Sequence, residues 1–274
     1  KGPSYFPCPE KKTEAEHKPM EFRARPMPLG KKKKAEKIFG LERHWLYLAV
    51  GLVLAPIFKI PGILNYMGWF FESLVHEIGH CAVAYFFGCI AIPAIRLDGH
   101  ACAIHRPQSM ALALLVWAAL AAGAFYFWKG KRNSFVFLLG SAALLYPLLA
   151  FTRSKELLHL LGGHGGELIF SAVFFWRTLV GGFYEESERP LYSMIAWYLW
   201  MQNIFLCWNL MYSPETRNWY LSHGSFGLEN DYIRVADMLS WSLTSVAGMM
   251  FFISLFLPPL GLLWGWWSYQ EEAA

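Results

Sequence analysis

The stretch His76-Glu77-Ile78-Gly79-His80 lies inside an apolar run that extends over residues 63–92. Two histidines four residues apart share one side of a helix, because four steps of about 100° nearly complete a turn. Glu77 then points about 100° away from His76 around the helix axis. In this arrangement two imidazoles can hold a zinc ion, while the neighbouring carboxylate handles the protons of its bound water.

The composition indicates a membrane protein built from helices. The chain of 274 residues is 55% hydrophobic and 16% charged, with 13 Trp, 13 Tyr and 22 Phe. Several runs of about 18 or more residues carry almost no charge, which disfavours a soluble helical core. We therefore expect an all-α, polytopic membrane protein with the lipid bilayer as its main surroundings.

Seven hydrophobic segments follow residue 40, so we expect about six to seven transmembrane helices. Pro56 is expected to kink the first segment and Pro258-Pro259 to break the last one. After the second segment, residues 95–97 alternate in polarity and residues 101–104 can pair back against them. This predicts a small hairpin with Asp98-Gly99 at its turn. The seven segments are residues 44–60, 63–92, 110–128, 135–151, 158–182, 191–211 and 236–267.

Residues 1–40 form a basic, Pro-rich tail that precedes a transmembrane domain over residues 41–274. The tail holds 11 Lys and Arg against 5 Asp and Glu. The positive-inside trend places it on the cytoplasmic side of a cell inner membrane or an organelle membrane. No aromatic or motif pattern supports nucleic-acid binding, so nucleic acid is not an expected partner.

Histidines occur as three spaced pairs, His76/His80, His100/His105 and His159/His164. Three such pairs are also expected of membrane di-iron oxygenases and desaturases. Their later pairs typically contain two adjacent histidines, and this chain has no His-His. A haem held by two histidines on facing helices is a further alternative, supported by the histidines alone.

The sequence HEIGHCAVAYFFG, from His76 to Gly88, resembles the site-2 protease family of intramembrane zinc metalloproteases. The resemblance implies a short β-hairpin after the motif helix, which residues 89–106 match. It also implies a later Gly-Pro-x-x-Asn element, where this chain has His164 for Pro and Glu167 for Asn. A still later Asp-Gly supplies the family's third zinc ligand, and this chain has Asp231 followed by Tyr232. Residues 41–274 would accordingly be a metallopeptidase-like domain.

The third metal ligand has three candidates. The resemblance implies Asp231, although an aspartate there can instead cap the final helix. Asp98 stands in a Leu-Asp-Gly string, but its place in the expected hairpin favours a turn residue. His164 and Glu167, three residues apart, share a helix face, so Glu167 can ligate the metal or hydrogen-bond a ligating imidazole. The glycines around them allow another helix to approach closely.

These patterns lead to one expected function and two alternatives. The expected function is an intramembrane zinc metalloprotease, with Glu77 as general base and zinc held by His76, His80 and Asp231. The partners would be a membrane-protein substrate and the bilayer. The first alternative is a catalytically inactive, protease-like scaffold subunit of a larger membrane complex. The second is a membrane di-iron oxygenase.

Overall fold

The computed structural model describes residues 37–38, 41–97, 101–131, 133–180, 186–223 and 229–273. Nine α-helices dominate this part of the chain, in agreement with the expected all-α class. Four of them, α3, α4, α5 and α9, are long and apolar enough to cross a membrane. A fifth span results if α1, η1 and α2 are counted together, although they are bent by 105°. The count is lower than six to seven because α1 (Arg43–Leu54) is short and α6 (Arg189–Tyr212) is not among the helices that are long and apolar enough to cross a membrane.

The motif helix α2 (Ile63–Phe86) follows the short 3-10 helix η1 (Ala55–Lys59), which carries Pro56 in its first turn. The helix changes from α to 3-10 at Ala55, next to Pro56, and the 105° bend lies in the break between Lys59 and Ile63. A kink at Pro56 itself stays a prediction. Gly88 adopts a φ of 77°, which favours glycine, and the helix ends before it. Residues 88–92 were expected in the span, but β3 (Ala91–Ile95) already pairs antiparallel with β4 (Ala101–His105). The hairpin is confirmed, with residues 91–95 in place of 95–97 as its first strand, and its expected turn at Asp98-Gly99 lies outside the described residues.

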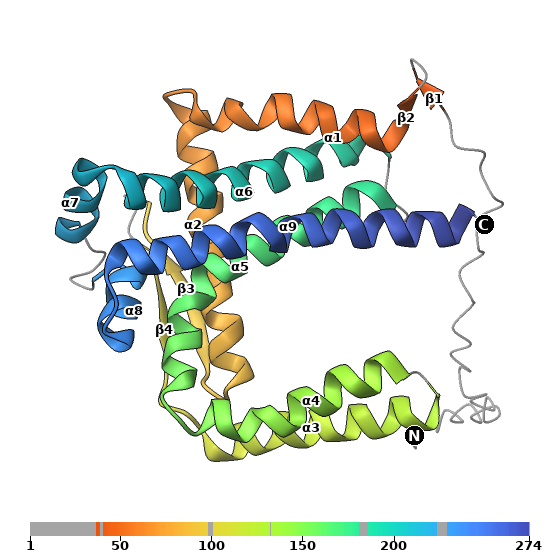
Figure 1. Ribbon diagram of the computed structural model, residues 1–274, viewed down its shortest axis with the longest axis vertical. Coiled ribbons are helices and arrows are strands. Elements are labelled where there is room, and N and C mark those ends of the chain that lie inside the picture. Colours follow the sequence, from red (N-terminus) through yellow and green to blue (C-terminus); the bar gives the residue numbers. More distant parts are fainter. Residues whose placement is uncertain are drawn as a thin grey trace, which may run out of the picture. The chain divides into compact units, whose positions relative to one another are not determined.

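Helix α5 (Ser154–Val180) occupies the centre, where it contacts α2, α6 and α9 (Leu243–Ala273) (Figure 1). Its side chains Leu168 and Phe175 are fully buried among these helices. By contrast, α3 (Met110–Lys129) and α4 (Asn133–Ala150) contact mainly each other. Only 6% and 11% of their apolar windows are buried, which fits helices that face lipid.

Three prolines lie inside the described helices, Pro147 in α4 and Pro258 and Pro259 in α9, and an indole of a neighbouring helix compensates for Pro147 and for Pro258. Pro258 has no N–H for the carbonyl of Ser254, and Trp200 Nε1 donates to that carbonyl at 2.6 Å. Pro147 likewise leaves the carbonyl of Ala143 without a backbone N–H donor, and Trp117 Nε1 donates to this carbonyl at 2.8 Å. Helix α9 therefore continues through Pro258-Pro259, and the expected break there was wrong.

The polar stretch between α6 and α9 is more ordered than its sequence indicates. It contains α7 (Pro214–Ser222) and α8 (Asp231–Leu239). The hydroxyl of Ser213 caps α7 by accepting from the backbone N–H of Thr216 at 3.2 Å. The remaining elements are η2 (Glu186–Glu188) and the pair β1 (Lys37–Ile38) and β2 (Leu41–Glu42).

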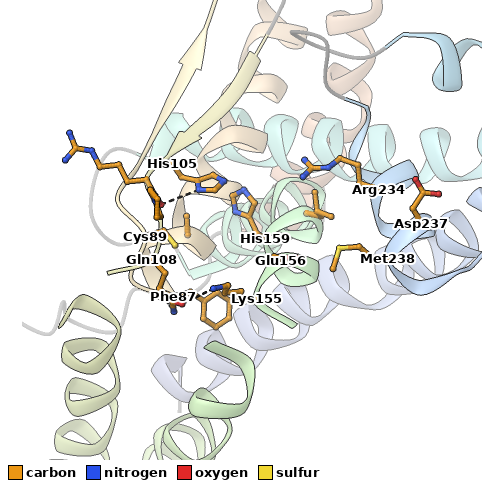
Figure 2. A pocket seen from close by; sticks show the side chains of 14 residues that line it. Phe87, Cys89, His105, Gln108, Lys155, Glu156, His159, Arg234, Asp237 and Met238 are labelled. Atoms are coloured by element: carbon orange, nitrogen blue, oxygen red, sulfur yellow. Dashed lines mark hydrogen bonds between the residues drawn. The ribbon is translucent and has the colours of Figure 1, made fainter. Parts of the chain in front are cut away.

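A cavity of about 670 Å³ lies between the ends of α2 and β4, the first turns of α5, and α8 (Figure 2). Its lining includes the apolar side chains of Phe87, Leu160 and Met238. Two imidazoles, His105 of β4 and His159 of α5, form part of its wall.

Candidate metal centre

Helices α2 and α5 cross at their glycines with no side chain between them. A Cβ added to Gly79 would lie 2.2 Å from the carbonyl oxygen of Gly162, and one on Gly166 would lie 2.6 Å from the Cα of Gly79. The close approach expected of this Gly-rich segment is therefore confirmed, and its partner is the motif helix. Gly165 alone of this group faces open space.

The crossing brings His76 and His80 together with Asp231, the first residue of α8. His76 Nε2 and His80 Nε2 lie 3.0 Å apart, and each lies 3.0 Å from Asp231 Oδ2. A tetrahedral ion with bonds of about 2.0 Å separates its ligand atoms by about 3.3 Å, so this triangle is slightly compressed. The three side chains are positioned to bind a metal ion. The residue expected as third ligand is thus the one that the fold places beside both histidines.

Hydrogen bonds on the far side of each ring fix which nitrogen faces the triangle. His76 Nδ1 donates to Glu167 Oε1 at 2.7 Å, and His80 Nδ1 donates to the carbonyl oxygen of His159 at 2.6 Å. Each neutral ring then directs its Nε2 lone pair toward Asp231. Three electron-rich atoms this close repel one another, so added protons or a cation must lie between them.

Gly163 leaves the space that an ion would need. A Cβ at this position would lie 2.3 Å from His76 Nε2 and 2.5 Å from His80 Nε2. Zinc–nitrogen bonds are about 2.0–2.1 Å long, so the missing side chain opens a volume at nearly bonding distance from both rings. The donor set and this space together fit a bound metal ion.

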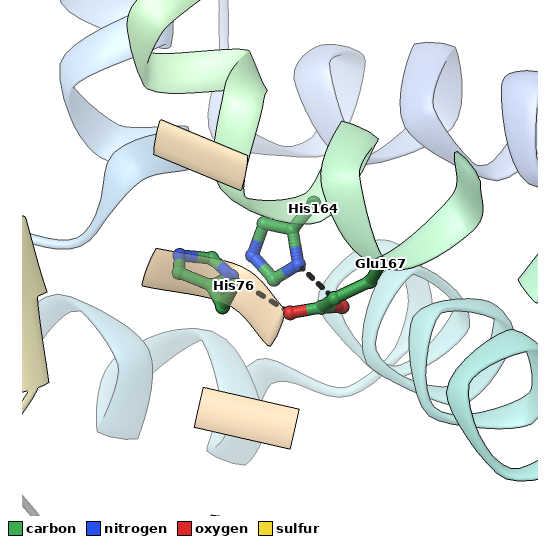
Figure 3. A group of neighbouring side chains, drawn as sticks. All are labelled: His76, His164 and Glu167. Atoms are coloured by element: carbon green, nitrogen blue, oxygen red, sulfur yellow. Dashed lines mark hydrogen bonds and ion pairs between the residues drawn. The ribbon is translucent and has the colours of Figure 1, made fainter. Parts of the chain in front are cut away.

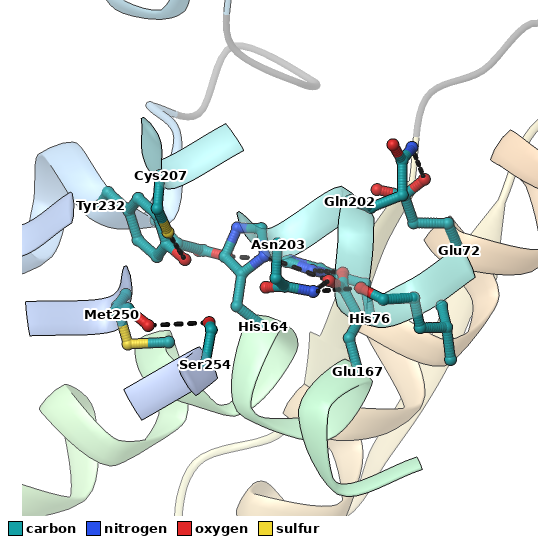
Figure 4. A network of polar contacts seen from close by, with 12 residues as sticks. Glu72, His76, His164, Glu167, Gln202, Asn203, Cys207, Tyr232, Met250 and Ser254 are labelled. Atoms are coloured by element: carbon teal, nitrogen blue, oxygen red, sulfur yellow. Dashed lines mark hydrogen bonds and ion pairs between the residues drawn. The ribbon is translucent and has the colours of Figure 1, made fainter. Parts of the chain in front are cut away.

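Glu167 is buried on α5 and holds His76 from behind (Figure 3). Its Oε2 accepts from Asn203 Nδ2 of α6 at 2.6 Å and faces His164 Nδ1 at a longer 3.3 Å (Figure 4). Of the two expected roles, the geometry favours support of a ligating imidazole, because Glu167 faces the nitrogen that points away from the triangle. His76, His164 and Glu167 are nevertheless close enough to hold an ion themselves in place of these hydrogen bonds.

Glu77 is buried, with 5% of its surface exposed, and its Oε2 has no hydrogen-bond partner within the described residues. Its carboxylate interacts electrostatically with His76 and His80. A buried carboxylate oxygen without a partner is costly, and native proteins keep such groups mainly where function requires them.

Neighbouring contacts hold Asp231 in position. Asn230 Nδ2 donates to the carbonyl oxygens of Tyr220 and His223, both at 2.6 Å, and so fastens the start of α8 to α7. Burial alone would raise the pKa of Asp231, but its contacts with the imidazoles of His76 and His80 outweigh burial and lower that pKa below its ordinary value. The carboxylate is therefore ionised and available as a ligand.

Tyr232, which departs from the family's Asp-Gly, has a structural explanation. Its fully buried ring lies 4.5 Å from that of His164, and its hydroxyl lies 3.8 Å from Cys207 Sγ. The side chain thus fills the space between α8, α5 and α6 behind the site.

The remaining sequence candidates lie elsewhere. Asp98 and His100 fall outside the described residues. The rings of His105 and His159 contact each other, with centroids 4.8 Å apart, but belong to neither candidate metal group. Sequence reasoning missed Asn203, whose only signal is an amide within an apolar helix.

No family model, curated protein or solved structure matches the chain.

Proposed function

We propose that the protein is an intramembrane zinc metalloprotease that cleaves peptide bonds of membrane-embedded substrates. Its long apolar helices fit a membrane protein. Its HExxH histidines share a donor triangle with Asp231, which is the ligand set implied by the resemblance to site-2 proteases. The observation that carries the proposal is the buried Glu77 carboxylate, whose Oε2 has no hydrogen-bond partner within the described residues and which interacts electrostatically with the residues of this triangle.

Each residue of the site has a defined task in this proposal. A zinc ion held by His76, His80 and Asp231 would polarise the scissile carbonyl and make the attacking water more acidic. Glu77 accepts the proton from that water at its unpartnered Oε2 and then delivers it to the leaving amine nitrogen. Glu167 keeps His76 in the tautomer that presents Nε2 to the metal.

The substrate must present an unwound segment, because the backbone groups of an intact helix are already hydrogen-bonded. Gly162 and Gly166 of α5 do not give room for it. Gly79 of α2 takes up the space at Gly162 and Gly166, so the substrate must approach from another side of the triangle.

The test compares the wild-type protein with Glu77→Gln in proteoliposomes. Both are reconstituted with a library of single-span helical proteins, and new N-termini are identified by mass spectrometry. The zinc content of both proteins is measured in parallel. We expect cleavage products from the wild type alone, with zinc retained in both. Products from the zinc-loaded Glu77→Gln variant would show that this mechanism is wrong.

Metal analysis of the purified chain separates the proposal from its alternatives. About one zinc per chain, lost in His80→Ala, supports the metalloprotease. Iron would favour the di-iron oxygenase, and His76, His164 and Glu167 would then be its additional donors. A chain that binds no metal would favour the protease-like scaffold.

A further inference from the structure

Five histidines, taken from three elements, form a continuous row of ring contacts. Adjacent centroids are separated by 4.8 Å for His105–His159, 5.1 Å for His159–His80, 4.7 Å for His80–His76 and 4.6 Å for His76–His164. The row begins at the exposed His105 of β4 and ends at the buried His164. Only its inner part belongs to the candidate metal centre.

The outer end of the row lies in the 670 Å³ cavity, together with further side chains of types that can bind metals. Cys89, Glu156 and Asp237 line the same space as His105 and His159 (Figure 2). Imidazole and thiol groups suit zinc and related transition metals, whereas calcium and magnesium prefer oxygen ligands.

The metal centre is only partly open, since the His80 residue is 6% exposed and the side chains of His76 and Asp231 are each 17% exposed. His80 is therefore the donor that an ion reaches only past other side chains. His159 stands between the cavity and His80, because its ring contacts His80 while its carbonyl oxygen accepts from His80 Nδ1.

We propose that His105 and His159 form a capture site that takes a divalent transition-metal ion from the cavity and passes it to His80. This inference relies on the metal centre of the proposed function, but not on proteolysis. The two rings, almost perpendicular at 73°, can share one ion, and the next imidazole lies one ring contact further in.

The charges around the cavity do not by themselves attract a cation. Arg106, Lys155 and Arg234 line it along with the carboxylates of Glu156 and Asp237. Lys155 Nζ donates to Gln108 Oε1 at 2.9 Å, so the ammonium of Lys155 is held by another residue that lines the cavity. Capture consequently depends on neutral nitrogen donors, and this selects transition metals over calcium and magnesium.

The experiment measures the rate at which the full-length, metal-free protein in detergent takes up Co²⁺. Cobalt gives a visible absorption band in a tetrahedral site of histidine and carboxylate ligands, so stopped-flow absorbance follows its arrival. We expect His105→Ala to slow both uptake and release by about tenfold or more, with an unchanged dissociation constant. His159→Ala keeps the backbone carbonyl that accepts from His80, and we expect it to behave in the same way. Because both act at one step, the double variant should be no slower than either single one.

The control is His223→Ala, which removes an exposed imidazole that stacks on Trp219 and makes no ring contact with the row, while the backbone carbonyl that accepts from Asn230 is kept. Its uptake rate should equal that of the wild type. Uptake by His105→Ala at the wild-type rate would overturn the capture site and leave the metal centre intact. Weaker equilibrium binding by His105→Ala would also overturn it, because His105 would then be a ligand of the bound state. A wild-type protein that binds no Co²⁺ would overturn both the metal centre and the capture site.

Discussion

Replacing Gly163 with alanine tests the metal centre by filling the space next to the two imidazoles, and it removes no donor atom. The new Cβ would lie 2.3 Å from His76 Nε2 and 2.5 Å from His80 Nε2. Non-bonded atoms of this kind stay roughly 3.5 Å apart, so each ring must move by about 1 Å. Metal ligands tolerate displacements of only about 0.5 Å. Loss of a single supporting hydrogen bond lowers metal affinity by about 10–100-fold. We therefore expect Gly163→Ala to weaken zinc binding by about 100-fold or more, equivalent to about 2.8 kcal/mol.

Gly165→Ala is the matched control, since it lies two residues further along the same helix and faces no atom within 4 Å. Alanine in place of a helical glycine should stabilise the protein by about 0.5–1 kcal/mol and leave zinc binding unchanged. Zinc affinity is measured by competition with a chelator, and circular dichroism of the metal-free proteins verifies that both variants are folded. A folded Gly163→Ala variant with wild-type zinc affinity would refute the placement of the ion beside these two rings.

Three further predictions follow from other contacts. Glu167→Gln should weaken zinc binding by about 10–100-fold in the same competition assay, because a neutral amide is a weaker hydrogen-bond acceptor for the His76 imidazole than a carboxylate. Unchanged affinity would contradict the role of Glu167 in supporting His76. Trp200→Phe should lower the free energy of unfolding by about 1–3 kcal/mol, because the carbonyl of Ser254 loses its indole donor, and Pro258 has no N–H to replace the indole. That loss should shrink when Pro258→Ala restores a backbone N–H, and denaturant titrations in detergent that give equal losses in both backgrounds would contradict the pairing. Gly79→Ala should destabilise the protein by about 3 kcal/mol or more, since its Cβ would meet the carbonyl oxygen of Gly162 at 2.2 Å; thermal unfolding at the wild-type temperature would contradict the close crossing.

The site could be predicted from the sequence as far as local spacing extends. HExxH places two imidazoles on one helix face whatever the rest of the chain does. Asp231 lies 155 residues after His76, and no periodicity links them, so its selection depended on a family resemblance alone. The role of Glu167 stayed open because its i, i+3 spacing from His164 was visible, whereas the decisive contact is with His76 on another helix.

The fold was predictable where hydrophobicity alone decides it, and α3, α4 and α6 lie close to their expected bounds. Helices α7 and α8 were missed because they are short and polar, so capping and tertiary contacts define them. The expected break at Pro258 was wrong for a related reason. A proline breaks a helix partly by leaving a carbonyl unpaired, and the sequence does not show that Trp200 of α6 supplies the missing hydrogen.

The indole bonds to Ser254 and Ala143 have a consequence for the order in which the helices assemble. Without α6 beside it, α9 would leave a carbonyl unpaired in apolar surroundings, which costs several kcal/mol. Because α6 precedes α9 in the chain, Trp200 is synthesised before the carbonyl that needs it. Likewise, Trp117 of α3 is synthesised before Pro147 of α4. In both cases the earlier helix acts as a template, and the later one reaches full hydrogen bonding only when it docks there.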